Sequence, residues 1–302
     1  MNIAGGIKFA LNSRGLENGF CRLNKIKKRF GITPEKLLKA IEHYLEILKP
    51  CGIKPTFFIT ACILDRYING IKRIGFDCAE WGIHGFVHTD HSRMALREQK
   101  KQIEKAIQVF DKHRVPFKGF RPPYLRTNGD TVKAVHDAGR FTYLSSKTIL
   151  WDEIYGPELK SLRWSNNFYQ PLPLASAFPY LAASGLVEIP VSLPDDDSLM
   201  DRDNLDPESV QELWLRMLRL TQQKNGVFIL QLHPERIFEL DGVLIRLIKE
   251  AKSLNPPLYI SSLGELAQVH SDQRPGTRGI FCITGDIDAM AIGDFALRLK
   301  EW

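Results

Sequence analysis

Three histidines and one aspartate fall within the eight residues from His84 to His91. His84 ends a predicted strand over Glu80–His84, and His88 follows it by four residues. Two imidazoles at this spacing, in a turn that leaves the carboxyl end of a strand, can bind one divalent metal ion, and imidazole suits zinc, iron, cobalt or nickel. The spacing therefore indicates a metal site, and a pair of ordinary surface histidines is the alternative.

Two further segments bring single polar residues to predicted strand ends. Arg121 and Tyr124 belong to the sequence Arg-Pro-Pro-Tyr, in which two prolines fix the backbone and hold the arginine and the tyrosine amide in place. His233 follows the apolar run Val227–Leu232, so a buried strand delivers one imidazole to its carboxyl end, as a general acid requires. The alternatives are a proline turn with a surface arginine, and a structural histidine whose ring is hydrogen-bonded.

A pair of carboxylates closes the last predicted strand. The run from Gly279 ends with Asp286 and Asp288, and alternation along an extended chain points both side chains to the same side. The alternative is a turn in which Asp288 caps a helix that begins near Ala289. The triplet Asp195–Asp197 is a third acidic set, but it follows Leu-Pro and is expected to lie in an exposed loop.

Short β-branched or aromatic runs alternate with amphipathic helical stretches along most of the chain. This alternation predicts parallel pairing, and eight or nine strands suit a barrel better than two small sheets. The predicted strands are Ile7–Asn12, Thr56–Thr60, Glu80–His84, Gly119–Arg121, Thr142–Ser145, Val187–Leu193, Val227–Leu232, Tyr259–Ser261 and Ile280–Thr284, and the predicted helices are 34–49, 93–113, 129–138, 206–223 and 241–253.

These elements predict a single α/β domain over residues 1–302. Residues 151–186, rich in proline and aromatic residues, are expected to form a long connection over the mouth of the barrel. Residues 279–302 are expected to form a C-terminal strand-helix extension.

Composition excludes several classes of protein. With 44% hydrophobic and 25% charged residues, the chain is neither disordered, collagen-like nor a coiled coil. No uninterrupted apolar run approaches the ~18 residues of a membrane span, and the first residues lack a basic region followed by an apolar stretch, so we predict a cytoplasmic location. Five scattered cysteines without a C-x-x-C pair argue against a disulfide framework or a zinc finger.

The net charge of +6 is concentrated near the N-terminus. Residues 1–54 carry 11 Lys and Arg against four Asp and Glu, and Lys25–Arg29 is the densest part. This region is either a solvated basic face or a contact for an anionic partner. Because no aromatic residues are interleaved for base stacking and no nucleic-acid motif follows, we predict no nucleic-acid partner. Peripheral contact with an anionic membrane surface stays open.

Taken in order, these motifs resemble those of the polysaccharide deacetylases of the NodB-homology class, also called carbohydrate esterase 4-like. The resemblance covers roughly residues 5–270 and includes the segment Gly52–Ile59, Gly-Ile-Lys-Pro-Thr-Phe-Phe-Ile. It implies a distorted (β/α)7-type barrel and a metal-dependent amidohydrolase that removes acetyl or formyl groups from amino sugars. Arg14–Gly19 and Ile189–Pro194 look most like the branch that deformylates a lipid-linked aminoarabinose.

The resemblance also implies roles for individual residues. His84 and His88 would be ligands of a divalent ion, with zinc favoured over cobalt, nickel or iron. Arg121 would orient the catalytic base, the Tyr124 amide would help to hold the oxyanion, and His233 would protonate the leaving amine. Trp151 would stand in for the hydrophobic wall near that acid, whose usual partner Asp is not recognisable in the sequence.

The first predicted strand departs from the family pattern. The family has an Asp-Asp or Asp-x-Asp pair there, whereas this chain has Ala10 and Asn12, which cannot serve as a base and as an anionic ligand. In a closed barrel the first and last strands are neighbours, so a final strand can deliver carboxylates to nearly the same place. Asp286 would then be the base and Asp288 the third metal ligand.

Two functions are compatible with these observations. One is a deacetylase or deformylase that hydrolyses the N-acyl amide of an amino sugar in a surface glycan or its lipid-linked precursor. The other is a catalytically inactive barrel of the same type that binds glycans or acts as a scaffold.

Overall fold

The computed structural model describes residues 29–151, 153–154, 159–174, 179–182, 184–272 and 278–301. The expected strand Ile7–Asn12, with Ala10 and Asn12, lies outside these residues. The segment Arg14–Gly19 and most of the basic run, Lys25–Lys28, also lie outside them.

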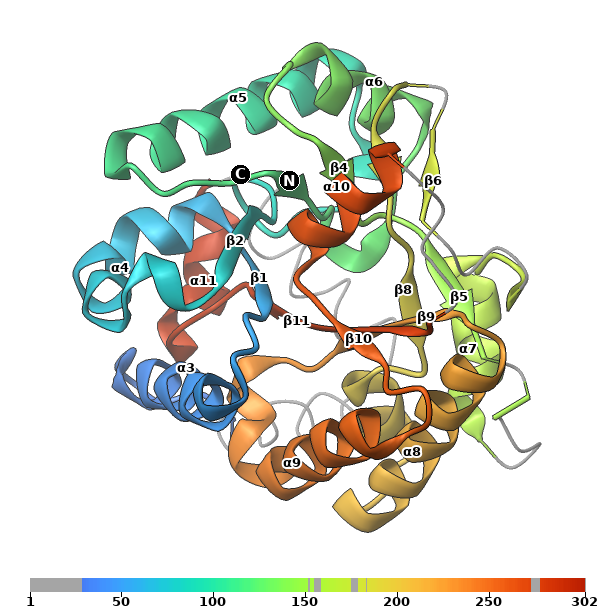
Figure 1. Ribbon diagram of the computed structural model, residues 1–302. Helices are drawn as coiled ribbons and strands as arrows, with labels where there is room; N and C mark the ends of the chain where they lie inside the picture. Colours follow the sequence, from blue (N-terminus) through green and yellow to red (C-terminus); the bar gives the residue numbers. More distant parts are fainter. Residues whose placement is uncertain are drawn as a thin grey trace.

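Nine of the described strands form one curled, mainly parallel sheet (Figure 1). The eleven described strands, two of which lie outside this sheet, are β1 (Thr56–Ile59), β2 (Glu80–Ile83), β3 (Gly119–Phe120), β4 (Tyr143–Leu144), β5 (Thr148–Leu150), β6 (Tyr180–Leu181), β7 (Val187–Glu188), β8 (Val191–Leu193), β9 (Val227–Gln231), β10 (Tyr259–Ile260) and β11 (Ile280–Ile287). The sheet order is β10-β11-β1-β2-β3-β4-β7-β6, and β9 also pairs with β11. Only the β6–β7 pair within this sheet is antiparallel in the described part of the chain.

A separate pair, β5 and β8, continues the curve toward β9. The Ile229 amide of β9 donates a hydrogen bond of 3.1 Å to the Ser192 hydroxyl of β8, which spans the gap. The sheet thus forms a half-barrel, and the predicted α/β, (β/α)7-type fold class is confirmed.

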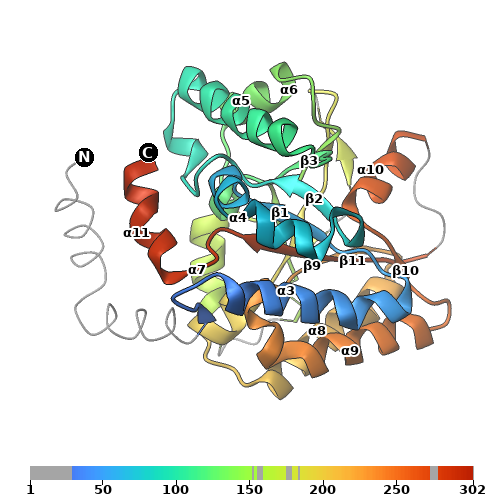
Figure 2. The same cartoon turned by 90° about the vertical axis from the view of Figure 1, so that its left-hand side faces the viewer.

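Helices surround the sheet, with α3, α8 and α9 along one side and α5 and α6 along another (Figure 2). The described helices are α3 (Glu35–Leu48), α4 (Ala61–Ile74), α5 (Leu96–His113), α6 (Gly129–Asp137), α7 (Lys160–Tyr169), α8 (Pro207–Gln223), α9 (Ile237–Ser253), α10 (Leu263–Asp272) and α11 (Ile292–Glu301). No helix in the described part of the chain has the length and apolar character that a membrane crossing requires.

Helix α3 illustrates how the sequence pattern produces this packing. Its apolar residues recur at helical spacing, so they form one stripe that faces the sheet and α9. Tyr44, in the middle of that stripe, packs edge-on against Phe57 of β1 with ring centroids 5.3 Å apart. The buried members of the stripe are Leu37, Leu38, Ile41, Tyr44, Leu45 and Leu48.

Strand β11, near the C-terminal end of the chain, lies inside the sheet. It pairs in parallel with β1 on one side and with β9 on the other, and all eight of its residues are buried. The register places Asp286 beside Phe58 of β1, and Thr284 beside Gln231 of β9. The position between the first described strand, β1, and β9 is therefore filled by the last described strand, β11.

Several predicted boundaries differ from the structure. The single strand expected over Val187–Leu193 is divided into β7 and β8, which belong to different sheets, with Pro190 between them. Helices α4, α7 and α10 were not predicted, and α7 lies within the expected connection 151–186. The helix expected to begin near Ala289 begins at Ile292.

Candidate functional site

Polar side chains gather where the parallel strands end. His84 follows β2, Arg121 follows β3, His233 lies two residues beyond β9, and Asp286 lies near the carboxyl end of β11. Because carboxyl ends of parallel strands meet at one rim, strand pairing brings together side chains that are far apart in the sequence.

Asp286 and Arg121 form a buried ion pair at this rim. Arg121 is fully buried, and its Nη1 donates to Asp286 Oδ1 at 2.9 Å. Gln231 Nε2 donates to the other carboxylate oxygen at 2.8 Å. Burial raises the pKa of Asp286, but the Arg121 guanidinium and nearby imidazoles outweigh this effect and hold the pKa below its ordinary value. Asp286 is therefore an ionised carboxylate in a fixed position.

Arg121 itself is held by neighbours on several strands. Its Nη1 also donates to Thr284 Oγ1 at 3.1 Å, and its Nη2 donates to Ser145 Oγ at 3.0 Å. Its guanidinium carbon lies 4.3 Å from the centre of the Phe58 ring, which is a cation–π contact. These contacts leave the guanidinium one orientation, and that orientation positions Asp286.

His84 presents one ring nitrogen toward Asp286. Its Nδ1 lies 2.8 Å from the Arg121 carbonyl oxygen, and burial lowers the pKa of the imidazole, so the neutral ring donates its Nδ1 proton to that carbonyl. The lone pair then resides on Nε2, which lies 3.7 Å from Asp286 Oδ2. An imidazole fixed in this tautomer by a hydrogen bond to the backbone is a typical metal ligand.

His88 and Asp288 form a second pair next to the first. The imidazole rings of His84 and His88 have centroids 5.2 Å apart, and His88 Nε2 lies 3.6 Å from Asp288 Oδ2. Burial lowers the pKa of His88 to about 3, so this ring is neutral as well. Asp288 does not cap α11; Asp294 accepts the Met290 and Ala291 amides at the start of that helix.

The separations within these pairs can be compared with those of metal ligands. Two ligands of a tetrahedral ion, each about 2.0–2.2 Å from the metal, lie about 3.4 Å apart. The distance of 3.6 Å between His88 Nε2 and Asp288 Oδ2 is close to this value and too long for a hydrogen bond. In the described part of the chain, the buried His88 Nδ1 has no hydrogen-bond partner. Imidazole and carboxylate are donor types that suit a divalent ion, and His88 and Asp288 have the spacing of two ligands of one ion, whereas the donors of His84, His88 and Asp288 do not all lie within 4.8 Å of one another in the described structure.

Tyr124 lies over this group from the loop after β3. Its ring meets the His88 ring edge-on, with centroids 4.3 Å apart. Its φ is +61°, a left-handed conformation that is uncommon outside glycine and concentrates at functional sites. The loop therefore holds the Tyr124 backbone in a defined and unusual orientation beside the histidines.

His233 is paired with Asp196, which belongs to the acidic triplet that was expected to lie in an exposed loop. His233 Nδ1 lies 2.7 Å from Asp196 Oδ1, and the His233 amide donates to Asp196 Oδ2 at 2.8 Å. Burial lowers the pKa of His233, but the Asp196 carboxylate outweighs burial and raises it well above its ordinary value. The imidazole is therefore protonated near neutral pH.

The expectation of an exposed loop at Asp195–Asp197 was wrong for Asp195 and Asp196, whose side chains are buried. Asp196 follows the carboxyl end of β8, and this position is the signal that could have identified it. Trp151, expected near the acid, is buried, and its ring centroid lies 6.2 Å from that of Phe228 on β9.

Asp196, Asp197 and His233 also have donor atoms that lie within 4.8 Å of one another, as a metal site needs. However, Arg236 donates to Asp197 Oδ1 at 2.7 Å, and Arg29 donates to the same oxygen at 3.3 Å. A metal ion placed there would be repelled by both guanidinium groups. We therefore interpret this cluster as an ion-pair network that holds the His233–Asp196 pair.

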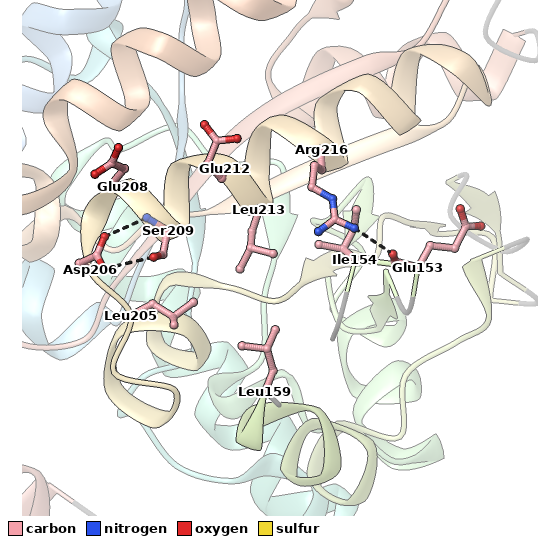
Figure 3. Close-up of a pocket in the computed structure, with 10 residues that line it drawn as sticks. All are labelled: Glu153, Ile154, Leu159, Leu205, Asp206, Glu208, Ser209, Glu212, Leu213 and Arg216. Atoms are coloured by element: carbon pink, nitrogen blue, oxygen red, sulfur yellow. Dashed lines mark hydrogen bonds between the residues drawn. The ribbon is translucent and has the colours of Figure 1, made fainter. Parts of the chain in front are cut away.

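A surface cleft of about 510 Å³ lies between α8 and the chain that leads into α7 (Figure 3). None of the predicted site residues lines it. Its walls combine an apolar floor with a mostly acidic rim, contributed by Glu153, Ile154, Leu159, Leu205, Asp206, Glu208, Ser209, Glu212, Leu213 and Arg216. The cleft is therefore separate from the polar group at the strand ends.

Fold and site together describe an α/β barrel with a histidine- and carboxylate-rich centre at the carboxyl ends of its strands. Residues 27–142 match the family model of the polysaccharide deacetylases. Among curated protein sequences, no match to the chain was found.

Solved structures share the fold. A crystal structure named for a polysaccharide deacetylase from Mycobacterium smegmatis is 21% identical, with a TM-score of 0.62 and 81% of each chain covered. One named for a polysaccharide deacetylase from Pseudomonas aeruginosa PAO1 is 17% identical, with a TM-score of 0.61, covering 78% of this chain and 73% of that one. A PuuE allantoinase structure is also 17% identical, with a TM-score of 0.60 and the same coverage.

Proposed function

We propose that this protein is a polysaccharide deacetylase-type enzyme that hydrolyses the N-acyl amide of an amino sugar with the help of a divalent metal ion. One observation carries the proposal. Asp286, near the end of β11, and Asp288, just after it, lie 3.7 and 3.6 Å from His84 and His88, where they would replace the carboxylates that Ala10 and Asn12 do not provide.

A divalent ion bound by His84, His88 and Asp288 would polarise the amide carbonyl and lower the pKa of water. Asp286, which is ionised and fixed by Arg121, accepts the proton of the attacking water. The Tyr124 amide would donate a hydrogen bond to the oxyanion as it develops. His233, protonated through its pairing with Asp196, donates a proton to the departing amine.

We further propose that the substrate is an amino sugar of a surface glycan or its lipid-linked precursor, with an acetyl or formyl group as the acyl part. The deformylase branch is proposed only on the resemblance of the segments Arg14–Gly19 and Ile189–Pro194 to that branch. A cytoplasmic location, and contact of the basic N-terminal region with an anionic membrane surface, stay predictions.

Metal content tests the ligand set. We expect the protein, purified without chelators, to contain a divalent ion by elemental analysis, and we expect His84→Ala/His88→Ala and Asp288→Asn to lose most of it. His136→Ala, which removes an exposed histidine on α6, is the matched control and should retain the metal. Equal metal in the double variant and the wild type would refute the proposed site.

Turnover tests the chemistry. Released acetate and formate are measured with a panel of N-acetylated and N-formylated amino sugars, both free and lipid-linked. Asp286→Asn should keep the metal and lose turnover by roughly 10²-fold or more, because it can no longer accept a proton. Metal binding without acyl release from any substrate would favour the inactive barrel.

A further inference from the structure

Arg298 of α11 contacts the carboxylate that we propose as a metal ligand. Its Nη2 donates to Asp288 Oδ2 at 2.9 Å and also to the Asp288 carbonyl oxygen. Its guanidinium carbon lies 4.8 Å from the centre of the Phe295 ring, and its side chain is 18% exposed. Arg298 is thus held by its own helix beside one residue, Asp288.

His88 also faces Asp288, but its Nε2 lies 3.6 Å from Asp288 Oδ2, which is too far for a hydrogen bond. Arg298 is therefore the cation in direct contact with this carboxylate.

Arg298 and the His88 ring both lie close to the same oxygen, Asp288 Oδ2. His88 Nε2 lies 3.6 Å from Asp288 Oδ2, on which Arg298 Nη2 also donates. An ion about 2 Å from Oδ2 would lie within about 5 Å of the guanidinium nitrogen. At that distance a divalent ion and a guanidinium repel each other in a buried setting.

We propose that Arg298 is an internal cation that holds Asp288 while no metal is bound, so that metal binding and the docking of α11 through Arg298 oppose each other. The inference rests on the proposed function, because it requires the ion at His84, His88 and Asp288. Binding of the ion displaces Arg298 from Oδ2, and the C-terminal helix thereby responds to the state of the site.

The experiment measures the affinity of the metal-free protein for Zn²⁺ and Co²⁺ by competition titration. We expect Arg298→Gln to bind at least tenfold more tightly than the wild type, because the competing cation is gone. Arg298→Lys keeps a charge and should stay within about threefold of the wild type. Arg140→Gln, which breaks an exposed ion pair with Asp111, is the control for net charge and should not change the affinity.

A second measurement uses the wild type alone, so it does not depend on folding of a variant. Amide hydrogen exchange of α11 should accelerate when Zn²⁺ binds. Unchanged or weaker affinity in a folded Arg298→Gln, or slower exchange in α11 with metal, would overturn the inference. If the inference about Arg298 fails but His84→Ala/His88→Ala loses metal binding, the proposed function still stands. If that double variant binds metal as well as the wild type, the proposed metal site itself is refuted.

Discussion

Asp196 determines the protonation state of His233. It accepts from both the ring and the backbone amide of that residue, and it is itself fully buried. The Nδ1 proton is bound to Asp196, which fixes the orientation of the ring and leaves the Nε2 proton of the protonated imidazole for the leaving amine. The proposed acid is therefore a pair of residues and not a lone histidine.

Replacement of Asp196 by asparagine tests this pairing. We expect the pKa of His233 to fall, because the anionic partner is lost while burial remains. Turnover should decrease by roughly 10²-fold at pH 8 and recover partly at lower pH. NMR titration of the ring protons measures the pKa, and an unchanged value would contradict the prediction.

The same pairing makes stability depend on pH. Because the pKa of His233 is higher in the folded than in the unfolded state, its stabilising contribution is complete below the unfolded value of about 6.5 and is lost as the pH rises through the folded value. The free energy of unfolding of the wild type should therefore exceed that of Asp196→Asn most at pH 6. The difference should shrink at higher pH.

At the scale of single residues, the sequence identified the site residues that follow clearly predicted strands. His84, Arg121 and His233 were recognisable because each follows a short apolar or β-branched run. Asp196 was missed, because an acidic triplet after Leu-Pro is typical of a surface loop. Arg298 carries no signal in the sequence, since one arginine in an amphipathic helix normally faces solvent.

At the scale of elements, β11 is the part of the structure that assembles the site. Strand β11 approaches β9 so closely that it requires a glycine at position 285, next to Asp286. A Cβ on Gly285 would lie 2.6 Å from the Leu232 carbonyl oxygen and 3.1 Å from Pro234 Cδ. The backbone around these atoms leads directly to His233.

Gly285→Ala should therefore destabilise the protein by about 1–3 kcal/mol, because backbone atoms must move to make room. The matched change is Gly293→Ala in α11, where a Cβ meets nothing within 4 Å. It should stabilise the helix by about 0.5–1 kcal/mol, since alanine loses less backbone entropy than glycine. Urea denaturation measures both, and equal effects would contradict the argument.

Strands and amphipathic helices were predicted more accurately than the helices hidden in apolar or aromatic stretches. Helix α3 gave a clear stripe, and its bounds differ from the prediction by one residue at each end. Helix α4 begins two residues after β1 ends, so an uninterrupted apolar run concealed the change of element. Helix α7 was obscured by its aromatic residues, which fit a loop over the barrel equally well.

At the scale of the whole molecule, the barrel depends on contacts between distant parts of the chain. The largest apolar side chains of β11 are Ile280, Phe281, Ile283 and Ile287, all buried. At about 1.5–3 kcal/mol each, their burial is worth about 6–12 kcal/mol. This is comparable to the 5–15 kcal/mol by which whole domains are usually stable.

A chain that ends at residue 278 should accordingly fail to fold. We expect it to lack near-UV circular dichroism and a cooperative unfolding transition. A chain that ends at Ala291 keeps β11 and should fold with a lower free energy of unfolding, because it loses the contact between Phe30 and Phe295. A well-folded, active protein without residues 279–302 would show that β11 is dispensable.

The strand order also has a consequence for the protein while it is being made. Thr56 of β1 pairs with Thr284 of β11, more than 200 residues later in the chain. At about 5–20 residues per second, a ribosome takes roughly 10–45 s to synthesise that interval. Throughout this time one edge of β1 has no native partner, and an apolar strand edge in that state can pair with other nascent chains. Translation of this interval is thus the stage at which β1 is most exposed to aggregation, and the acidic pair can reach the histidines only after β11 has been synthesised.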